Sequence, residues 1–510
     1  MGLWSFYFIS KYYLFLKGYI QIDFVLNLLF FLFLIIPVER EVRFYKAIKG
    51  AKVMLGLVLS ILLLWHDSWL PSFHKTVTFL MDEGLPLKEY LVMFSRSFFN
   101  GWELAIMGII FLLSFLANRR EISLTPIAFI LLVLVPLQNY HNDSTGEIDH
   151  RVGNFFDDES KRAIRFVRPK DESQDTDIIF LHVCSLSWDD LKEIGQEKNP
   201  FFSQFDYMLT EFNGVTSYSG PSAIRILRSA CGQLQHKQLY QDVAEDCYLF
   251  PQLQSMDYQI EAVLNHDGIY GHFSEEIQKL GHLSSPITPH DLPVKSINFD
   301  GSSIYDDYEV LGKWWNERNS PSIKKTALYF NTISLHEGTH FIGEKEWWKQ
   351  DRKEKYRTSL LKLFSDFTEF MHLVESSGRK AIIIFVPEHG MALRGSKIQV
   401  AGLRDIPLPQ ITRVPVGIKL IGFKNFKSEG TSKIISKPVS YFSLSYILSQ
   451  FVKINSNELI NPAIQSIMNQ LPETEFVSEN EEAKIVQMKG NFYLYGKEKI
   501  WRQLSPDLSN

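Results

Sequence analysis

Long apolar segments crowd the first 140 residues of the chain. Four of them are long enough for a helix to cross a lipid bilayer. They lie at roughly residues 22–38, 51–66, 102–118 and 124–139. A fifth apolar segment, Trp4 to Leu16, is interrupted by Lys11 and fits either a further span or an interfacial helix with an aromatic belt. The pattern predicts an α-helical transmembrane domain over residues 1–139, with four or five helices.

Basic residues predict how these helices are oriented. The loop between the first two clear spans is rich in them, with Arg40, Arg43, Lys46, Lys49 and Lys52. The short loop between the third and fourth spans carries Arg119 and Arg120. Loops rich in lysine and arginine stay in the cytoplasm. The loop at residues 66–73 and everything after Gln138 are therefore expected to lie outside the cytoplasm.

Residues 140–176 have the composition of a linker. Residues 141–150 are polar and turn-rich, and residues 170–177 form a charged run. Between these two segments, NFFDDESKRAIRFVR at residues 154–168 has the pattern of a short amphipathic helix. Two interpretations fit this helix equally: it lies near the membrane surface, or it is an ordinary solvated linker helix.

From Asp177 onward, short apolar strands alternate with helical segments. Strands are expected at residues 177–183, 258–266, 326–334, 380–386 and 416–423. The clearest helix spans residues 351–378 and stops at Gly378. This alternation predicts a mostly parallel sheet covered on both faces, in an α/β domain over residues 177–510. Residues 483–504 have the pattern of short strands around turns, which predicts a small appended sheet.

Composition narrows the class of function. The mean hydropathy of −0.07 is an average over two very different halves. The net charge of −5 and the lack of a basic stripe argue against a nucleic-acid partner. The 3 cysteines exclude a disulfide scaffold but permit one bridge and one free thiol. Cys231 and Cys247 stand 16 positions apart, where an oxidising compartment favours a bridge; two unpaired thiols are the alternative.

Side chains that bind metals follow three of the predicted strands. They are Cys184 after the first strand, His336 and His340 after the third, and Glu388 and His389 after the fourth. In open α/β sheets, ligands bind beyond the carboxyl ends of the strands. A thiolate, a carboxylate and an imidazole together suit zinc with a fourth position left open. Cys184, Glu388 and His389 are therefore the predicted ligands, with a small buried hydrophobe as the alternative role of Cys184.

Ser219 is the candidate nucleophile. It lies in TSYSGPSAIRILRSAC, residues 216–231, shortly before Pro221, a residue suited to the first turn of a helix. A helix N-terminus stabilises phosphate oxygens, and zinc coordination lowers the pKa of a serine hydroxyl. A simple cap or turn is the alternative role of Ser219, and the local sequence leaves Ser217 and Ser222 as alternative nucleophiles.

Several specific motifs occur along the chain: CSLSWDDL (184–191), TSYSGPSAIRILRSACGQ (216–233), CYLF (247–250), NFDGSSIYDD (298–307), SGRKAIIIFVPEHGMALRG (377–395) and GLRDIPLPQITRVPVGIK (402–419). Together they resemble the alkaline-phosphatase superfamily, specifically its membrane-bound phosphoethanolamine transferases and, within these, the enzymes that modify bacterial cellulose. The resemblance covers nearly the whole chain. It implies an alkaline-phosphatase-like (sulfatase-like) fold for the extracytoplasmic domain.

The resemblance also implies the roles of particular residues. Zn²⁺ would be bound by Cys184, Glu388, His389 and the nucleophile Ser219. His336 would lie close to the transferred phosphate and assist the leaving or entering oxygen. The remaining implied residues are Arg404, which contacts the phosphoethanolamine group, Tyr218, which lines the same pocket, and the disulfide partners Cys231 and Cys247.

The implied reaction transfers phosphoethanolamine from phosphatidylethanolamine to the C6 hydroxyl of a glucose in cellulose, through an intermediate on Ser219. The implied location is the bacterial inner membrane, with the catalytic domain in the periplasm and cellulose synthase subunits as partners. Relatives that modify lipid A carry a carboxylate and usually a threonine where this chain has Cys184 and Ser219, and they have more disulfides, which favours cellulose as the acceptor. The alternatives are a phosphatase, a transferase that acts on lipid A or another glycan, and a non-catalytic scaffold of the secretion complex.

Overall fold

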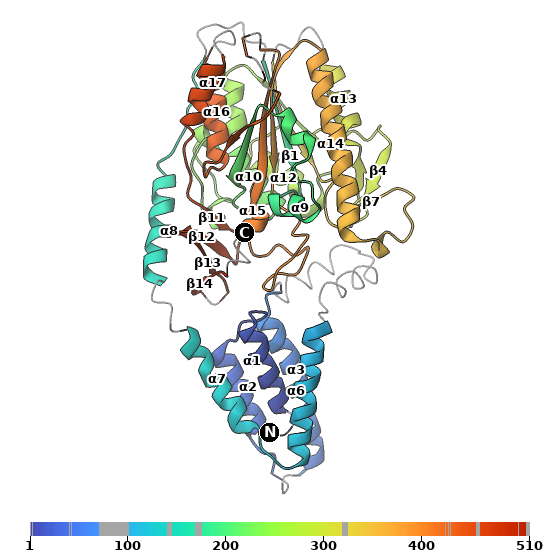
Figure 1. Cartoon of the computed structure of the whole chain (residues 1–510), viewed down its shortest axis with the longest axis vertical. Helices are drawn as coiled ribbons and strands as arrows, with labels where there is room; N and C mark the ends of the chain where they lie inside the picture. Colours follow the sequence, from blue (N-terminus) through green and yellow to red (C-terminus); the bar gives the residue numbers. More distant parts are fainter. Residues whose placement is uncertain are drawn as a thin grey trace. The chain divides into compact units, whose positions relative to one another are not determined.

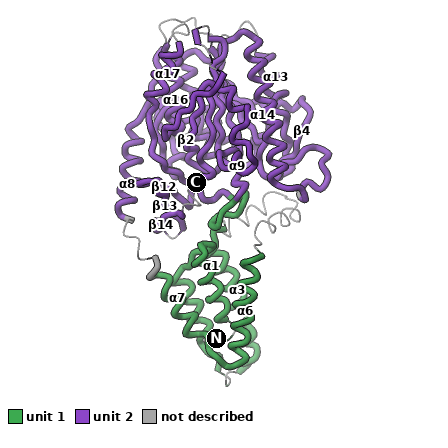
Figure 2. The backbone as a smooth tube through the Cα atoms, viewed as in Figure 1, with its two compact units in different colours: residues 1–145, 395–403 green, residues 146–394, 404–510 purple. Residues whose placement is uncertain are grey.

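The computed structural model describes most of the chain. The described residues are 2, 4–39, 41, 43–70, 101–139, 145–168, 176–318, 325–423, 425–426, 428, 430–454, 460–497 and 499–505. They form two compact units (Figure 2): unit 1 comprises residues 1–145 and 395–403, and unit 2 comprises residues 146–394 and 404–510. Residues 71–73 of the predicted outer loop, and most of the charged run at 170–177, lie outside the described residues.

Unit 1 is helical, and each of the four predicted apolar segments contains a helix (Figure 1). The helices are α1 (Trp4–Leu16), α2 (Phe24–Ile35), α3 (Tyr45–Asp67), α6 (Gly101–Arg119) and α7 (Thr125–Asn139). Within the described residues, α3 and α6 are long and apolar enough to cross a membrane. The apolar parts of α2 and α7 are shorter.

Helix α1 packs inside unit 1 despite its lysine. Phe8 and Tyr12 are buried in an apolar cluster with side chains of α2 and α7. Lys11 is buried as well, because its Nζ lies 2.7 Å from Asp67 Oδ2 and donates a hydrogen bond of 2.8 Å to Asn27 Oδ1. Its charge therefore does not exclude α1 from the apolar cluster, since the carboxylate at the end of α3 neutralises it.

We expect Lys11→Met to lower the free energy of unfolding by about 3–5 kcal/mol, because Asp67 then keeps a buried charge without a cation. The double variant Lys11→Met/Asp67→Leu should recover most of this loss, since neither charge is left. Thermal unfolding of the full-length protein in detergent, followed for the wild type and the three variants of the cycle, measures both effects. Equal destabilisation of the single and double variants would contradict the pairing.

Unit 2 is built on a seven-stranded sheet with the order β10-β2-β9-β8-β1-β6-β3. The strands are β1 (Thr176–Val183), β2 (Tyr207–Asn213), β3 (Gln259–Leu264), β6 (Thr326–Thr332), β8 (Lys380–Pro387), β9 (Arg413–Ile421) and β10 (Lys433–Ile435). Strand β9 is antiparallel to β2 and β8, and the other neighbours are parallel. All five predicted strands are present, which confirms the mostly parallel sheet; β2 and β10 were not predicted.

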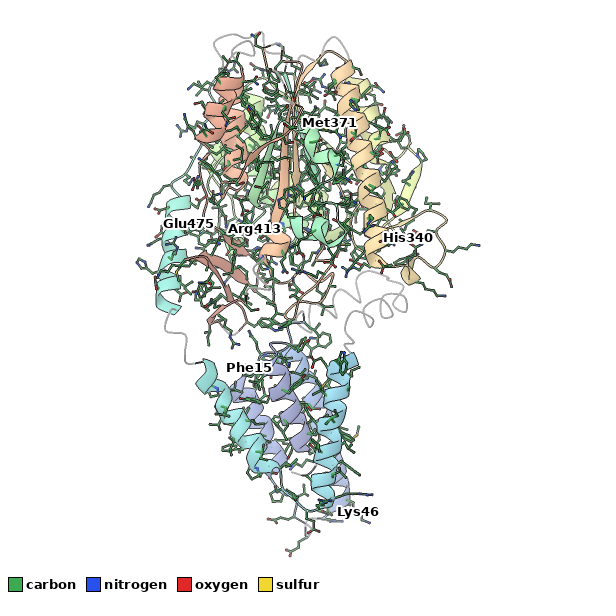
Figure 3. The ribbon with its side chains drawn as sticks, in the orientation of Figure 1. Phe15, Lys46, His340, Met371, Arg413 and Glu475 are labelled. Carbon is green, nitrogen blue, oxygen red and sulfur yellow. A yellow bond between two sulfur atoms is a disulfide. The ribbon has the colours of Figure 1, made fainter. Side chains whose placement is uncertain are left out.

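Helices cover both faces of this sheet, as predicted (Figure 1). One face packs against α10 (Ser219–Leu227), α11 (Leu249–Ser255), α12 (Phe273–Lys279), α16 (Tyr441–Lys453) and α17 (Asn461–Asn469). The other packs against α9 (Trp188–Glu193), α13 (Asp307–Arg318) and α14 (Arg352–Ser376), whose Met371 is labelled in Figure 3. Successive strand residues alternate between the two cores, as in Ile179 and Phe180. The predicted long helix is α14.

Two smaller sheets complete unit 2. The appended sheet predicted at the C-terminal end is present, with strands β11 (Val477–Glu479), β12 (Lys484–Met488), β13 (Asn491–Tyr495) and β14 (Trp501–Gln503). A three-stranded sheet in the order β5-β4-β7 was not predicted. Its strands are β4 (Val294–Ile297), β5 (Ser303–Tyr305) and β7 (His340–Phe341).

The amphipathic helix of the linker lies earlier than predicted. Helix α8 spans Thr145–Glu159, and beyond it Ala163 forms an antiparallel bridge with Cys231. The buried residues of α8 recur at helical spacing, and they pack against β11, β12 and β14; they are Ile148, Val152, Phe155 and Phe156. The predicted bounds of 154–168 are therefore wrong, and the apolar face that suggested a membrane-surface helix is used for packing within unit 2.

Candidate functional site

The register of the central strands brings two of the predicted ligands together. Val183 at the end of β1 lies opposite Pro387 at the end of β8. The next residues, Cys184 and Glu388, therefore leave the sheet side by side, and His389 follows. The donor atoms of these three fully buried side chains all lie within 4.8 Å of one another.

Ser219 of helix α10 completes this cluster. It is the first residue of that helix, and its Oγ lies 3.4 Å from Cys184 Sγ and 3.3 Å from His389 Nε2. The sequence placed it just before the helix, one position from where the structure has it. Its hydroxyl therefore faces two of the predicted metal ligands at a helix N-terminus, where backbone N–H groups attract anionic oxygens.

The two alternative serines point elsewhere. Ser217 Oγ donates to the carbonyl oxygen of Arg404 and accepts a hydrogen bond of 2.6 Å from Asn480 Nδ2. Ser222 Oγ lies 2.7 Å from Tyr441 Oη, beneath α10. Of the three serines, Ser219 is the one whose hydroxyl contacts Cys184 and His389.

One oxygen of Glu388 faces the cluster without a donor. Its Oε1 accepts a hydrogen bond of 2.6 Å from Asn331 Nδ2, whereas the buried Oε2 has no hydrogen-bond partner of good geometry among the described residues. Burial raises the pKa of Glu388, and the nearby Ser219 hydroxyl and Arg404 oppose that rise. A buried carboxylate oxygen left in this way is a position where a cation fits.

Burial also favours the uncharged forms of the other two predicted ligands, Cys184 and His389. Burial and the negative charge of Glu388 raise the pKa of the Cys184 thiol to about 12. Burial and Arg404 hold the pKa of His389 well below its usual range, so its imidazole is neutral. A divalent cation supplies the positive charge that a thiolate beside a carboxylate requires. The donor set of one sulfur, one oxygen and one nitrogen fits zinc.

The orientation of the His389 ring also suits a role as a metal ligand. Its Nδ1 lies 3.0 Å from the carbonyl oxygen of Gly390. An N–H at Nδ1 that donates to this carbonyl leaves the lone pair of Nε2 directed at Ser219 and the cluster. Asp190 fixes the following loop, since it accepts hydrogen bonds from the backbone N–H groups of Met391 and Leu393 at 2.6 and 3.0 Å.

Arg404 lies next to the cluster, with Nη1 3.3 Å from His389 Nδ1, and it also reaches Cys184 through Ser185, a residue that no sequence pattern indicated. Arg404 Nη1 donates a hydrogen bond of 3.0 Å to Ser185 Oγ, which in turn lies 3.2 Å from Cys184 Sγ. Ser185 has a left-handed φ of 71°, a conformation that costs energy for a residue with a Cβ, and Tyr356 Oη donates to its carbonyl oxygen at 2.6 Å. This backbone conformation directs the Ser185 hydroxyl between the thiol and the guanidinium.

Tyr218 and the Arg404 loop are held by the C-terminal sheet. Tyr218 Oη donates to Asp405 Oδ1 at 2.8 Å, and its ring is 38% exposed. Asn480, just after β11, donates from Nδ2 to the carbonyl oxygens of Arg404 and Asp405 at 3.2 and 3.0 Å. Asn480 is 76 residues from Arg404 in the chain, so no local pattern signals this contact.

The two histidines after β6 have different surroundings. His336 lies outside the cluster of metal-ligating side chains, but near enough to Arg404 for its charge to act on the ring; burial and this charge lower the pKa of His336 to about 3. His340 instead belongs to β7, where its ring stacks on Trp347 with centroids 4.6 Å apart; it is labelled in Figure 3. The structure therefore does not bring His340 to the cluster.

The sequence analysis also did not select His182 and Asn331, two buried polar residues next to Glu388. His182 of β1 lies opposite Asn331 of β6, and His182 Nδ1 is 3.4 Å from Glu388 Oε1 and 2.8 Å from Tyr329 Oη. Burial lowers the pKa of His182 to about 3. The signal was present, because both are polar residues inside otherwise apolar strands.

Cys231 and Cys247 form a disulfide, and Cys184 is a buried free thiol. The disulfide joins the segment after α10 to the short 3-10 helix Glu245–Cys247, which precedes α11. The chain thus has the one bridge and one free thiol that its cysteine count permits.

Comparison with known proteins identifies the family. The model of the cellulose biosynthesis protein BcsG C-terminal domain matches residues 136–501, and that of the BcsG N-terminal domain matches residues 4–137. The cellulose biosynthesis protein BcsG of Escherichia coli (strain K12) is 31% identical, with 96% of this chain and 94% of the relative covered. The protein of the same name from Salmonella typhimurium is 30% identical, with the same shares covered.

Among solved structures, the chain is similar to a protein in the alkaline phosphatase superfamily from Vibrio parahaemolyticus. The sequence identity is 10% and the TM-score 0.48, with 70% of this chain and 91% of that chain covered. The two family models together span nearly the whole chain, and each of the two relatives covers 96% of it. The chain therefore belongs to the BcsG family of cellulose biosynthesis proteins.

Proposed function

We propose that this chain is a zinc-dependent phosphoethanolamine transferase that modifies cellulose. The observation that carries the proposal is the convergence of Ser219 with Cys184, Glu388 and His389 at one edge of the sheet, in a chain of a cellulose-biosynthesis family. The motifs around these residues resemble those of membrane-bound phosphoethanolamine transferases, and the covered, mostly parallel sheet of unit 2 suits an alkaline-phosphatase-like fold.

In the first step, Ser219 Oγ forms a bond to the phosphorus of phosphatidylethanolamine, and the bond from phosphorus to the diacylglycerol oxygen breaks. The serine proton goes to that oxygen, and phosphoethanolamine stays on Ser219. Zinc held by Cys184, Glu388 and His389 would lower the pKa of the attacking hydroxyl and offset phosphate charge. The N-terminus of α10 and the Arg404 guanidinium stabilise the equatorial oxygens, where phosphoryl transfer draws most of its stabilisation.

In the second step, the C6 hydroxyl of a glucose unit attacks the same phosphorus, and the bond to Ser219 Oγ breaks. The sugar proton passes to His336 and from there to Ser219 Oγ. His336 Nδ1 lies 3.0 Å from the carbonyl oxygen of Glu337, so an N–H there leaves Nε2 free to accept a proton. Burial keeps the ring neutral by lowering its pKa, and a phosphate anion in the site raises its basicity. Tyr218 lines the pocket in which the phosphoethanolamine group lies.

Because the proposed donor is a lipid, the apolar helices of unit 1 would keep the catalytic domain close to the membrane that contains it. We propose that residues 1–139 form the transmembrane domain, with four or five spans, and that residues 140–176 link it to a periplasmic catalytic domain at 177–510. Helices α3 and α6 are long enough to span the inner membrane. Anchoring needs only one span, so the further helices fit a lipid platform or docking to cellulose synthase subunits.

Transfer assays with the full-length protein test this proposal. The protein in phosphatidylethanolamine vesicles is offered a cello-oligosaccharide and, separately, lipid A, and phosphoethanolamine on each product is measured by mass spectrometry. We expect the cello-oligosaccharide to be modified and lipid A to be left unchanged. Modified lipid A would make the cellulose assignment wrong, free phosphoethanolamine alone would indicate a phosphatase, and no reaction would favour a scaffold.

A further inference from the structure

Three aromatic rings meet beside the candidate site and form what we call the aromatic wall: Tyr270, Phe299 and His336. The His336 ring stacks on Phe299 with centroids 5.0 Å apart and an interplanar angle of 24°. The Tyr270 ring meets Phe299 edge-on at 4.9 Å and lies 6.3 Å from His336. The wall therefore begins at the residue proposed to handle the acceptor proton.

The wall opens to solvent at its outer end. Phe299 is only 5% exposed, whereas Tyr270 is 37% exposed. Tyr218, next to Ser219, is 38% exposed. Tyr270 thus presents a partly exposed ring that contacts the buried Phe299 and lies 6.3 Å from His336.

The inner end of the wall is built rigidly by the motif NFDGSSIYDD, residues 298–307, which has no role in the chemistry above. Asp300 Oδ1 accepts hydrogen bonds from Ser302 N at 2.9 Å and Ser302 Oγ at 2.6 Å, and Gly301 has a φ of +85°. Gly338, with a φ of +81°, lets the loop of His336 approach Phe299, since a Cβ there would lie 2.6 Å from Phe299 Cβ. Phe299 is therefore fixed against His336.

We infer that Tyr270 forms an acceptor subsite, where its ring stacks on a glucose unit of a β-linked glucan, and that Phe299 positions His336 at the inner end of the wall. This inference rests on the proposed function. An amphipathic tyrosine suits this partly exposed position, because one side of its ring packs on Phe299 while the rest stays accessible. The flat C–H faces of a β-linked glucose ring pack on such aromatic surfaces. A glucan held there presents its C6 hydroxyl toward His336 and the phosphorylated serine.

Tyr270→Ala in the full-length protein tests the subsite. We expect the KM for a cello-oligosaccharide to rise about 5- to 10-fold, as loss of one stacked ring predicts, while phosphoethanolamine loads onto Ser219 at the wild-type rate. Calorimetric titration with cellohexaose in the absence of the lipid donor should show the same loss of affinity, and Tyr270→Trp should keep it. Tyr240→Ala, at a tyrosine that is 47% exposed and outside the wall, is the matched control and should behave as the wild type.

Phe299→Leu separates positioning from binding. We expect kcat for transfer to fall several-fold with little change in acceptor KM, because His336 loses the ring against which it stacks. An unchanged acceptor KM and cellohexaose affinity in Tyr270→Ala would overturn the subsite. Slower loading of Ser219 in that variant would also overturn it and would assign the tyrosine to the lipid donor. Failure of the proposed function looks different, because the wild type would then form no adduct while its glucan affinity remained measurable.

Discussion

Ser219→Ala is expected to abolish transfer of phosphoethanolamine and to leave the protein without an adduct, a loss on the order of 10³-fold or more. Alanine removes the one hydroxyl that contacts both Cys184 and His389. Neither neighbouring serine can replace it, because their hydroxyls are held by other partners. Intact-mass measurement of the full-length protein after incubation with phosphatidylethanolamine detects the adduct, and peptide mapping assigns it.

Ser222→Ala is the matched control for this experiment. It lies on the same helix, one turn further on, and its hydroxyl contacts Tyr441 Oη at 2.7 Å and the Glu388 carbonyl oxygen at 3.5 Å, but neither Cys184 nor His389. We expect it to form the adduct at nearly the wild-type rate. An adduct of undiminished yield in Ser219→Ala would show that another residue is the nucleophile, and the mapped peptide would identify it.

Glu388→Gln is expected to lose zinc as well as activity. The amide keeps the shape of the side chain but removes the charge, and a neutral amide oxygen is a weak zinc ligand. We expect the affinity for zinc to fall by about 100-fold or more, since loss of even an outer-shell partner costs 10- to 100-fold. Metal content after dialysis against a zinc buffer measures this directly, and the thermal unfolding temperature should no longer rise when zinc is added.

Removal of the metal from the wild type should have the same effect, reversibly. A chelator is expected to stop adduct formation, and added zinc to restore it. Glu375→Gln is a suitable control, because Glu375 lies on α14 and pairs with Lys419 at 2.9 Å, away from the cluster. If Glu388→Gln bound zinc as tightly as the wild type, the proposed ligand set would be wrong.

The fold was predictable where the apolar pattern is continuous. The runs that became β1, β6 and β8 are buried on both faces, so apolar residues dominate them without alternation and mark central strands. Strand β2 was not predicted because Thr210 and Glu211 interrupt its apolar pattern. Strand β10 was not predicted because it is only 3 residues long. Helix α8 was placed too late because its polar first turns have the composition of a loop, although Ile148 and Val152 continue the helical spacing.

The candidate site was predictable only in part, for a related reason. Cys184, Glu388 and His389 could be chosen because parallel strands deliver their carboxyl ends to one edge, a rule that operates on sequence alone. Ser185 and Asn480 could not, because their roles arise from a left-handed backbone and from a contact across the sheet. His182 and Asn331 are intermediate cases, polar residues in apolar strands whose common partner, Glu388, appears only in three dimensions.

The sequence by itself determined the helical first part, the α/β second part and the three residue types that favour a metal, because periodicity and strand ends are local properties. The tertiary structure alone decided which of three serines meets the ligands, that a buried aspartate accommodates Lys11 inside unit 1, and that His340 lies apart from His336. Each of these depends on atoms from elements distant in the chain, and the distance between such atoms is set by packing that no local pattern contains.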